Sequence, residues 1–234
     1  MPVFEIICLA NSRKLSGRCI AGLRTDGRGW IRPVGESPDG TLFQGHYILE
    51  NGSEARVLDV LKIDFTRPRP DPYQPENWLI RGKRWELVAR PAPLKDQRAF
   101  HSYIVPGPTL FGNQSDRVSV ETFTKAPAEA SLALVIPDSM EWIIKKNIRG
   151  KRQIRALFSL SGTLYDLGVT DPMFEQYLKS LPLGNYSLKS IGLRKTDKLL
   201  LTVSLGEPFQ GDCYKLITSV LLFKGRECCN LFEK

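Results

Sequence analysis

The sequence predicts a mainly β protein, and three observations support this prediction. Short runs of β-branched and apolar residues recur along the chain, as in residues 3–9 (VFEIICL) and 132–136 (LALVI). Polar, Gly-rich and Pro-rich stretches separate these runs, and only one segment carries clear signals of a helix start. The 234 residues are 42% hydrophobic and 25% charged. A globular chain of this length suits two domains of about 100 residues each.

The first half contains five strand candidates, which are residues 3–9, 18–23, 30–34, 57–65 and 83–89. Residues 67–75 hold four prolines, which lack backbone N–H donors, so this stretch is predicted to be an extended loop. Residues 76–80 are predicted to form a short helical turn. The polar residues 11–17 (NSRKLSG) are predicted to be a turn between the first two strands.

The second half contains six strand candidates, which are residues 132–136, 140–145, 153–160, 163–168, 198–205 and 214–223. Asp171 is a typical N-cap and Pro172 a typical first helical residue, so a short helix is predicted from here to about residue 180. Several strands, one short helix and two more strands form the order of an OB barrel, a five-stranded Greek-key fold. The extra strand is explained by a bend in one long strand.

The predicted fold is therefore two OB-like (Greek-key) barrels, with a short helix in at least the second. Residues 106–130 are poor in apolar periodicity and rich in Pro, Gly, Ser and Thr. They are predicted to be a linker segment between an N-terminal domain, residues 1–105, and a C-terminal domain, residues 131–234.

The formal net charge of +8 favours polyanionic partners. Five irregularly spaced cysteines argue against a secreted disulfide framework and for a reducing cytosol. The N-terminus has no basic segment followed by a long apolar run, and no apolar run approaches the roughly 18 residues of a membrane span. We therefore expect a cytoplasmic protein with no membrane partner.

Part of the chain resembles a known family. The strings CLANSRKLSGRCIAGL and GRGWIRPVG, within Cys8–Gly35, resemble the opening of bacterial proteins described as dual OB domain-containing. Residues 169–172, 204–209 and 214–216 resemble pieces of their second half. The resemblance implies two OB-like domains and a nucleic-acid-binding role in bacterial defence or nucleic-acid maintenance. It implies no catalytic residues.

The first candidate binding group combines cations with an indole. Its members lie within 20 residues of one another: Arg13, Lys14, Arg18, Arg24, Arg28, Trp30 and Arg32. Single-stranded nucleic acid needs cations for its phosphates and flat rings for its unstacked bases. The alternative is that Trp30 belongs to the core and the arginines form a solvated surface.

The second group lies around a predicted turn at residues 147–150. It holds six cations and no acid in 11 residues: Lys145, Lys146, Arg149, Lys151, Arg152 and Arg155. Cations on a turn can follow a phosphate backbone. The alternative is a hairpin tip whose charge serves only solubility.

A third group repeats the basic–aromatic pattern: Arg81, Lys83, Arg84 and Trp85. In this hypothesis Trp30, Trp85 and Trp142 supply the stacking surfaces, provided that their faces are exposed. The alternative for Trp85 is a place in the core.

No cofactor, metal or catalytic residue is predicted. The chain has no Cys-x-x-Cys pair, no Gly-rich phosphate loop and no G-x-S-x-G elbow. The sequence thus favours a binding protein over an enzyme and leaves RNA and DNA equally open. Two alternatives remain: a protein-interaction module of a larger complex, and a metal-dependent enzyme acting on nucleotides that uses acids such as Asp64, Asp71 and Glu76.

Overall fold

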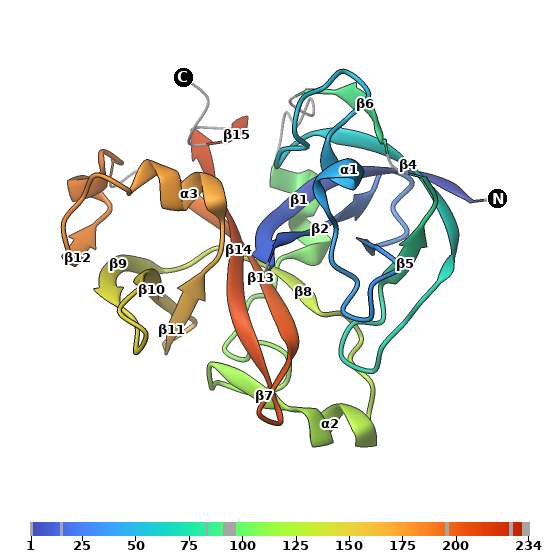
Figure 1. Cartoon of the computed structure of the whole chain (residues 1–234). Coiled ribbons are helices and arrows are strands. Elements are labelled where there is room, and N and C mark those ends of the chain that lie inside the picture. Colours follow the sequence, from blue (N-terminus) through green and yellow to red (C-terminus); the bar gives the residue numbers. More distant parts are fainter. Residues whose placement is uncertain are drawn as a thin grey trace. The chain divides into compact units, whose positions relative to one another are not determined.

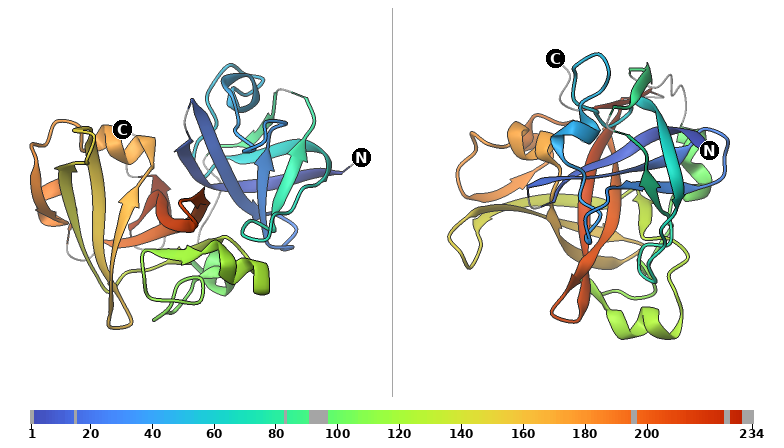
Figure 2. Two further views of the ribbon diagram at one scale, coloured as in Figure 1. Left: turned by 60° about the horizontal axis from the view of Figure 1, so that its bottom comes forward. Right: turned by 45° about the vertical axis from the view of Figure 1, so that its right-hand side comes forward.

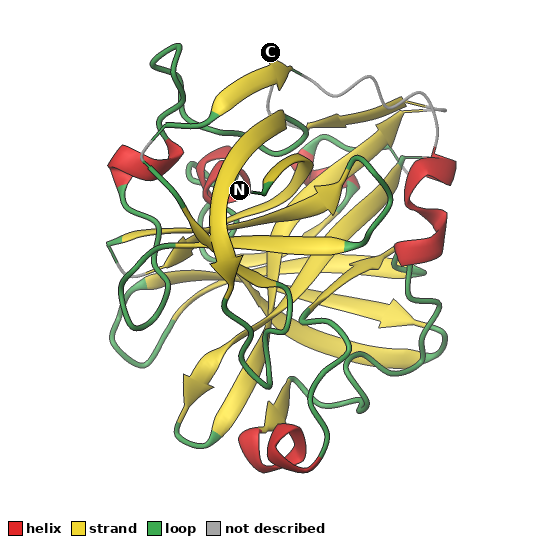
Figure 3. Ribbon diagram, turned by 90° about the vertical axis from the view of Figure 1, so that its right-hand side faces the viewer, coloured by secondary structure: helices red, strands yellow, loops and turns green. Residues whose placement is uncertain are grey.

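A computed structural model describes the whole chain except residues 1, 15, 83, 91–96, 195–196, 225–226 and 231–234. Strands supply most of its regular structure (Figure 3). The chain divides into two compact units: Met1–Leu94 with Phe123–Ser131, and Lys95–Thr122 with Leu132–Lys234. The predicted linker segment 106–130 thus contributes to both units.

The described residues up to position 90 of the first unit form six strands and one short helix, most of them labelled in Figure 1. They are β1 (Val3–Lys14), β2 (Gly17–Arg24), β3 (Trp30–Val34), α1 (Gln44–Tyr47), β4 (Val60–Pro68), β5 (Asn77–Ile80) and β6 (Glu86–Ala89). The strand order is β1-β2-β3-β5-β4-β6, and an additional pairing of β1 with β4 closes the first five strands into a barrel. β3 and β5 run parallel and every other pair runs antiparallel. This is the OB barrel that the sequence predicts.

Two local predictions for this unit are wrong. Residues 77–80 are not a helical turn but strand β5, because they pair with β3 on one side and β4 on the other. The polar residues 11–14 are not a turn, because they continue β1 and pair with residues 17–20 of β2. Asn11 and Ser12 are buried in this part of the strand, and Arg13 faces solvent.

The barrel interior is filled by apolar side chains from every strand. The fully buried members include Ile6, Ile20, Ile31, Leu61 and Phe65. At Gly22 a side chain is excluded, because a Cβ atom would lie 2.2 Å from the Ile7 carbonyl oxygen.

The second unit contains the remaining strands and most of the helical turns. They are η1 (Gln97–Tyr103), β7 (Arg117–Ser119), β8 (Leu132–Val135), β9 (Ser139–Lys146), β10 (Arg152–Leu160), β11 (Thr163–Val169), α3 (Pro172–Tyr177), β12 (Gly184–Ser187), η2 (Lys189–Ile191), β13 (Lys198–Phe209), β14 (Asp212–Lys224) and β15 (Glu227–Asn230). Helix α2 (Val120–Lys125) spans the point where the two units divide. β13 and β14 form the long antiparallel pair seen in Figure 2.

The second unit repeats the OB order with one strand broken in two. Its sheet order is β12-β9-β10-β11-β14-β13-β8, and β11 runs parallel to β14. Only residues 136–138 separate β8, which pairs with β13, from β9, which pairs with β10. Together β8 and β9 therefore occupy the place of the first OB strand, which is the bent strand that the sequence suggested. Strand β12 was not predicted, because its sequence GNYS carries no apolar run.

Helix α3 lies between the third and fourth barrel strands, where an OB fold places its helix. The predicted N-cap is present: Asp171 Oδ1 accepts hydrogen bonds from the Met173 and Phe174 amides at 2.9 and 3.1 Å. Phe174 is fully buried and packs on Trp142, with ring centroids 4.3 Å apart. The helix thereby covers part of the second core.

None of the helices within the described ranges is both long and apolar enough to cross a membrane.

Candidate nucleic-acid interface

The hairpin between β9 and β10 carries an exposed cluster of cations, which we call the basic hairpin. Its members are Lys145, Lys146, Arg149, Lys151 and Arg152. In OB terms it is the loop between the first and second strands, one of the loops with which OB folds bind oligonucleotides and oligosaccharides. The second predicted group is thus brought together on one turn, apart from Arg155, which lies further along β10.

The turn of the basic hairpin is held by one side chain. Asn147 Oδ1 accepts hydrogen bonds from the amides of Arg149 and Lys151, at 2.9 and 3.0 Å. Its own backbone amide donates to the Lys151 carbonyl at 2.8 Å. Gly150 has a φ of +72°, a left-handed conformation that glycine adopts without strain. The tip is therefore shaped by backbone and by Asn147, and the cationic side chains take no part in holding it.

The cations of the basic hairpin have no acidic partner among the described residues. Lys145, Lys146, Arg149 and Lys151 form no ion pair with any residue that the structure describes. Arg152 also lacks an ion pair there but donates from Nη2 to the Leu178 carbonyl at 2.8 Å. Unpaired cations at an exposed turn keep their full charge available for an anionic ligand.

Arg155 differs from the rest of its predicted group. Its Nε lies 2.6 Å from Asp166 Oδ1, and its Nη2 donates to the Asp166 carbonyl at 2.6 Å. The side chain is only half-buried, but its charge is already matched by a neighbouring strand. It therefore adds less to the positive potential of this face than the tip residues do.

The first predicted group is largely neutralised by acids that are distant in sequence or adjacent in the loop. Lys14 pairs with Asp39, Arg18 with Glu54 at 3.0 Å, and Arg24 with Asp26. The hydrogen bond from Arg24 lowers the pKa of Asp26. Arg28 has 77% of its side chain exposed and lies 3.8 Å from Asp26, and Arg13 is also exposed. Trp30 is half-buried.

Arg32 is part of the interior, which corrects its prediction as a phosphate ligand. It is 3% exposed, and its Nε and Nη2 donate to Glu76 Oε1 at 3.1 and 3.0 Å. Nη2 also donates to Ser131 Oγ, and Nη1 donates to Cys19 Sγ at 2.8 Å. Desolvation alone would lower the pKa of Arg32, but its contacts with Cys19 and Glu76 outweigh it and raise the pKa. A buried charge is tolerated only when it is paired and hydrogen-bonded in this way. Arg32 therefore has a structural role in the first barrel.

Trp85 and Trp142 cannot stack on bases, which corrects a second prediction. Their exposed fractions are 1% and 0%, so both indoles are core residues. Trp142 shares its strand face with Met140 and Ile144, which are also buried. Trp85 joins the core of the first barrel.

The third predicted group therefore loses its aromatic member. Arg81 and Arg84 are exposed at the end of β5 and beyond it, and Lys83 lies outside the described residues. An exposed aromatic that the sequence did not single out is Phe209, which is 58% exposed at the β13–β14 turn. In an OB barrel this turn joins the fourth and fifth strands and takes part in ligand binding.

One lysine is buried rather than presented to solvent. Lys215 is 1% exposed, and its Nζ donates to Asn113 Oδ1 and to the Asn113 carbonyl at 2.6 and 3.0 Å. Desolvation lowers its pKa to about 8. Lys215 therefore serves the second core and not the surface.

Within the described part of the chain, no group of three or more His, Cys, Asp or Glu side chains is arranged to hold a metal ion. Asp64, Asp71 and Glu76 do not form such a group, and Glu76 is engaged by Arg32 and Ser131. The carboxylate of Glu76 is thus a structural partner.

Comparison with known proteins agrees with the fold. No curated protein matches the chain significantly. Among solved structures, the crystal structure of the tetrameric p202 HIN2 aligns over 95% of both chains, with 9% sequence identity and a TM-score of 0.30. The family model of the dual OB-containing domain matches residues 4–220. With one closed barrel, a second sheet in OB order and nearly the whole chain matched, this protein belongs to the family of dual OB-containing domains.

Proposed function

We propose that this protein binds nucleic acid and that the basic hairpin of the second barrel is its main phosphate contact. The observation that carries the proposal is the set of four exposed, unpaired cations at residues 145, 146, 149 and 151, among the residues that the structure describes. OB folds generally bind nucleic acid, but a fold alone does not fix a function, so the argument rests on this site.

The arrangement of charge favours a polyanion as the ligand. Lys146 and Arg152 are register partners across the hairpin, and like charges directly opposite each other destabilise a sheet. A phosphate backbone lying along the hairpin would remove this repulsion and release its own counterions. The contrast with the first predicted group is informative, since most of its cations already have acidic partners.

Several residues remain proposed secondary contacts. In the first barrel these are Arg13, Lys14, Arg18, Arg28, Trp30, Arg81 and Arg84. In the second barrel, Arg155 would act beside the hairpin, and Phe209 offers an exposed ring for stacking. The ligand is proposed as single-stranded or structured RNA or DNA. The role in bacterial defence or nucleic-acid maintenance, the cytoplasmic location and the absence of a cofactor stay predictions.

The test is a titration of fluorescein-labelled oligonucleotides, followed by anisotropy at several salt concentrations. Single-stranded RNA, single-stranded DNA and an RNA hairpin are compared. The variant Arg149→Glu with Lys151→Glu removes two tip cations without touching the Asn147 bonds, which involve only their backbones. Arg152 is left intact because it supports the Leu178 carbonyl.

A matched control carries the same change of charge elsewhere. Arg67→Glu with Lys189→Glu alters two exposed cations, one in each unit, that are not part of the basic hairpin. We expect the hairpin variant to lose affinity about tenfold or more, and its slope of log K against log salt to fall by about 2. The control should lose much less. Equal losses in both variants would reduce the effect to net charge and contradict the proposed site.

A further inference from the structure

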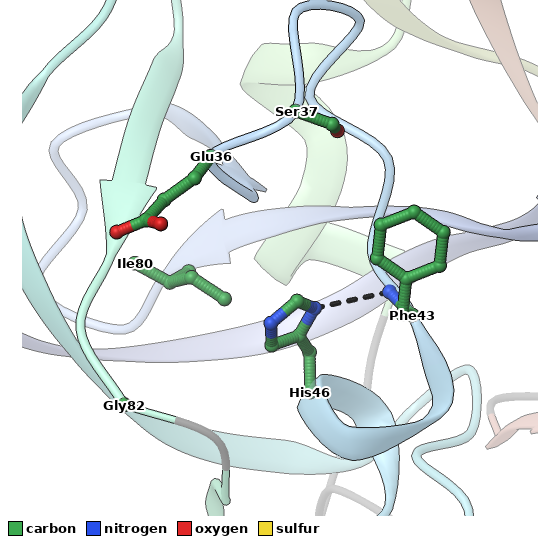
Figure 4. A pocket seen from close by; sticks show the side chains of 6 residues that line it. All are labelled: Glu36, Ser37, Phe43, His46, Ile80 and Gly82. Carbon is green, nitrogen blue, oxygen red and sulfur yellow. Dashed lines mark hydrogen bonds between the residues drawn. The ribbon is translucent and has the colours of Figure 1, made fainter.

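A cavity of about 340 Å³ lies in the first barrel, beside the short helix α1. It is lined by Glu36, Ser37, Phe43, His46, Ile80 and Gly82 (Figure 4). Its volume is within the range of small-molecule sites, about 300–1,000 Å³. None of the residues used for the basic hairpin belongs to it.

Its imidazole is held in one tautomer. The Phe43 amide donates to His46 Nδ1 at 3.0 Å, so in the neutral ring the proton resides on Nε2. Figure 4 shows this second nitrogen on the side of the cavity where the Glu36 carboxylate lies. The imidazole is thus fixed in the wall of the cavity, and the Glu36 carboxylate is a group that, when ionised, only accepts.

The remaining walls suit a flat ring. Ile80 is 6% exposed and lies between Glu36 and His46 in Figure 4, where it forms an apolar floor. Phe43 is 45% exposed, although it is a large apolar side chain. An aromatic ring left in solvent at the mouth of a cavity is a stacking surface for a base.

The loop that carries Glu36 is fixed before any ligand binds. Arg69 Nη1 donates to the Gly35 and Ser37 carbonyls at 2.8 and 3.1 Å, and Arg69 Nη2 donates to the Pro38 carbonyl at 3.1 Å. Gly35 lies so close to the Thr41 carbonyl oxygen that a Cβ atom would approach it to 2.6 Å. A preorganised loop spends less free energy on ordering when a ligand arrives.

This set of groups discriminates among bases. A carboxylate accepts well from two adjacent donors, and guanine presents N1–H and N2–H₂ side by side, with O6 beside them as an acceptor for an N–H donor. Cytosine and adenine offer one exocyclic amine. Uracil and thymine offer a single N–H flanked by two carbonyl oxygens, which a carboxylate repels.

We propose that this cavity binds a guanine base, stacked on Phe43, with Glu36 accepting from its N1–H and N2–H₂ groups. Arg81 and Arg84 are exposed on either side of Gly82 in the sequence and supply positive charge for the attached phosphate. The base can come from a free nucleotide or from a nucleic-acid strand; the strand-borne form rests on the proposed function.

The test uses the full chain and isothermal titration calorimetry with GMP, AMP, CMP and UMP. A second arm compares octauridylate with the same strand carrying one guanine, at a fixed salt concentration. Glu36→Gln loses one of the two acceptors, and we expect about a tenfold loss of preference for guanine over uracil. Glu129→Gln, an exposed change of the same kind outside the cavity, should leave the preference intact.

A second pair of variants tests the stacking surface. Phe43→Ala should weaken guanine binding about fivefold or more, and Phe43→Tyr should retain it. Because Phe43 is exposed, truncation should not unfold the barrel, and circular dichroism melting checks this.

The outcomes of these titrations distinguish failure of the guanine site from failure of the proposed function. Selective GMP binding without strand binding supports the cavity and refutes the proposed function. Strand binding that is equal with and without guanine, and unchanged by Glu36→Gln, overturns the cavity and leaves the basic hairpin standing.

Discussion

Lys146 and Arg152 lie directly opposite each other in the ladder of β9 and β10, and both side chains are exposed. Their mutual repulsion lowers the stability of the folded protein. A substitution that removes this repulsion should therefore change stability and nucleic-acid affinity in opposite directions. Lys146→Glu should create an attractive cross-strand pair and raise the free energy of unfolding by about 0.5 kcal/mol. The same change should weaken oligonucleotide binding. Urea denaturation and anisotropy measure the two effects, and a parallel fall in both would refute this reading of the hairpin.

The interior ion pair of the first barrel gives a prediction of a different kind. Arg32→Met leaves the Glu76 carboxylate buried without its guanidinium and should cost about 3–5 kcal/mol of unfolding free energy. Replacing both residues with Met removes the buried charge altogether and should recover most of the loss. Denaturant titrations of the two variants make the comparison. If the double variant is as unstable as the single one, the burial of charge is not the cause.

Asp171 joins helix α3 to strand β14. Besides capping the helix, its Oδ2 accepts from the Val220 amide at 3.0 Å, and burial raises the pKa of this carboxyl to about 6. Asp171→Ala should destabilise the protein by about 2–3 kcal/mol, since it removes a cap and leaves a buried amide unpaired. Asp171→Asn keeps an acceptor oxygen and should cost less. Thermal and urea unfolding of both variants provide the measurement, and equal losses would show that an acceptor oxygen at this position is not enough for the stabilisation.

Lys215 predicts a pH dependence above neutrality. Its pKa is lowered from 10.5 to about 8 in the folded protein, so between these values the unfolded chain holds more protons. Stability contributed by this group must therefore rise as pH increases from about 8 to 10.5, by at most about 3 kcal/mol.

A second titrating group, the thiol of Cys213, changes stability with pH in the opposite direction and has to be separated from Lys215. Burial raises the pKa of Cys213 from 9.0 to about 11, which makes stability fall with pH over that interval. Lys215→Met retains Cys213, so the difference in unfolding free energy between wild type and variant isolates the lysine. A difference that stays constant from pH 7.5 to 10.5 would contradict the lowered pKa.

The strand order and the capped helix of the second unit could be predicted because each depends on local signals. Mostly apolar segments of five to ten residues mark the strands, and Asp171–Pro172 marks the helix start. Strand β5 could not be predicted in the same way, because Asn77–Ile80 becomes a strand through its neighbours β3 and β4. Such pairing is a tertiary property.

The same distinction between local and long-range signals applies to the candidate site. The cations around Asn147 are close in sequence and exposed, so their clustering was visible. The partners that neutralise Arg18 and Arg32, namely Glu54 and Glu76, are 36 and 44 residues away and could not be assigned from the sequence. The burial of Trp142 did leave a signal, because a period of two places it with Met140 and Ile144 on one face.

The turn at Asn147 determines which residues of the hairpin tip can be substituted without changing its backbone. Backbone atoms and the Asn147 side-chain oxygen form the hydrogen bonds that hold the hairpin tip. The side chains of residues 148, 149 and 151 make none of these bonds. We therefore expect these three side chains to be replaceable without a change in the backbone of the turn. Substitutions at these three positions can therefore change the charge of the hairpin tip without changing the backbone that shapes it.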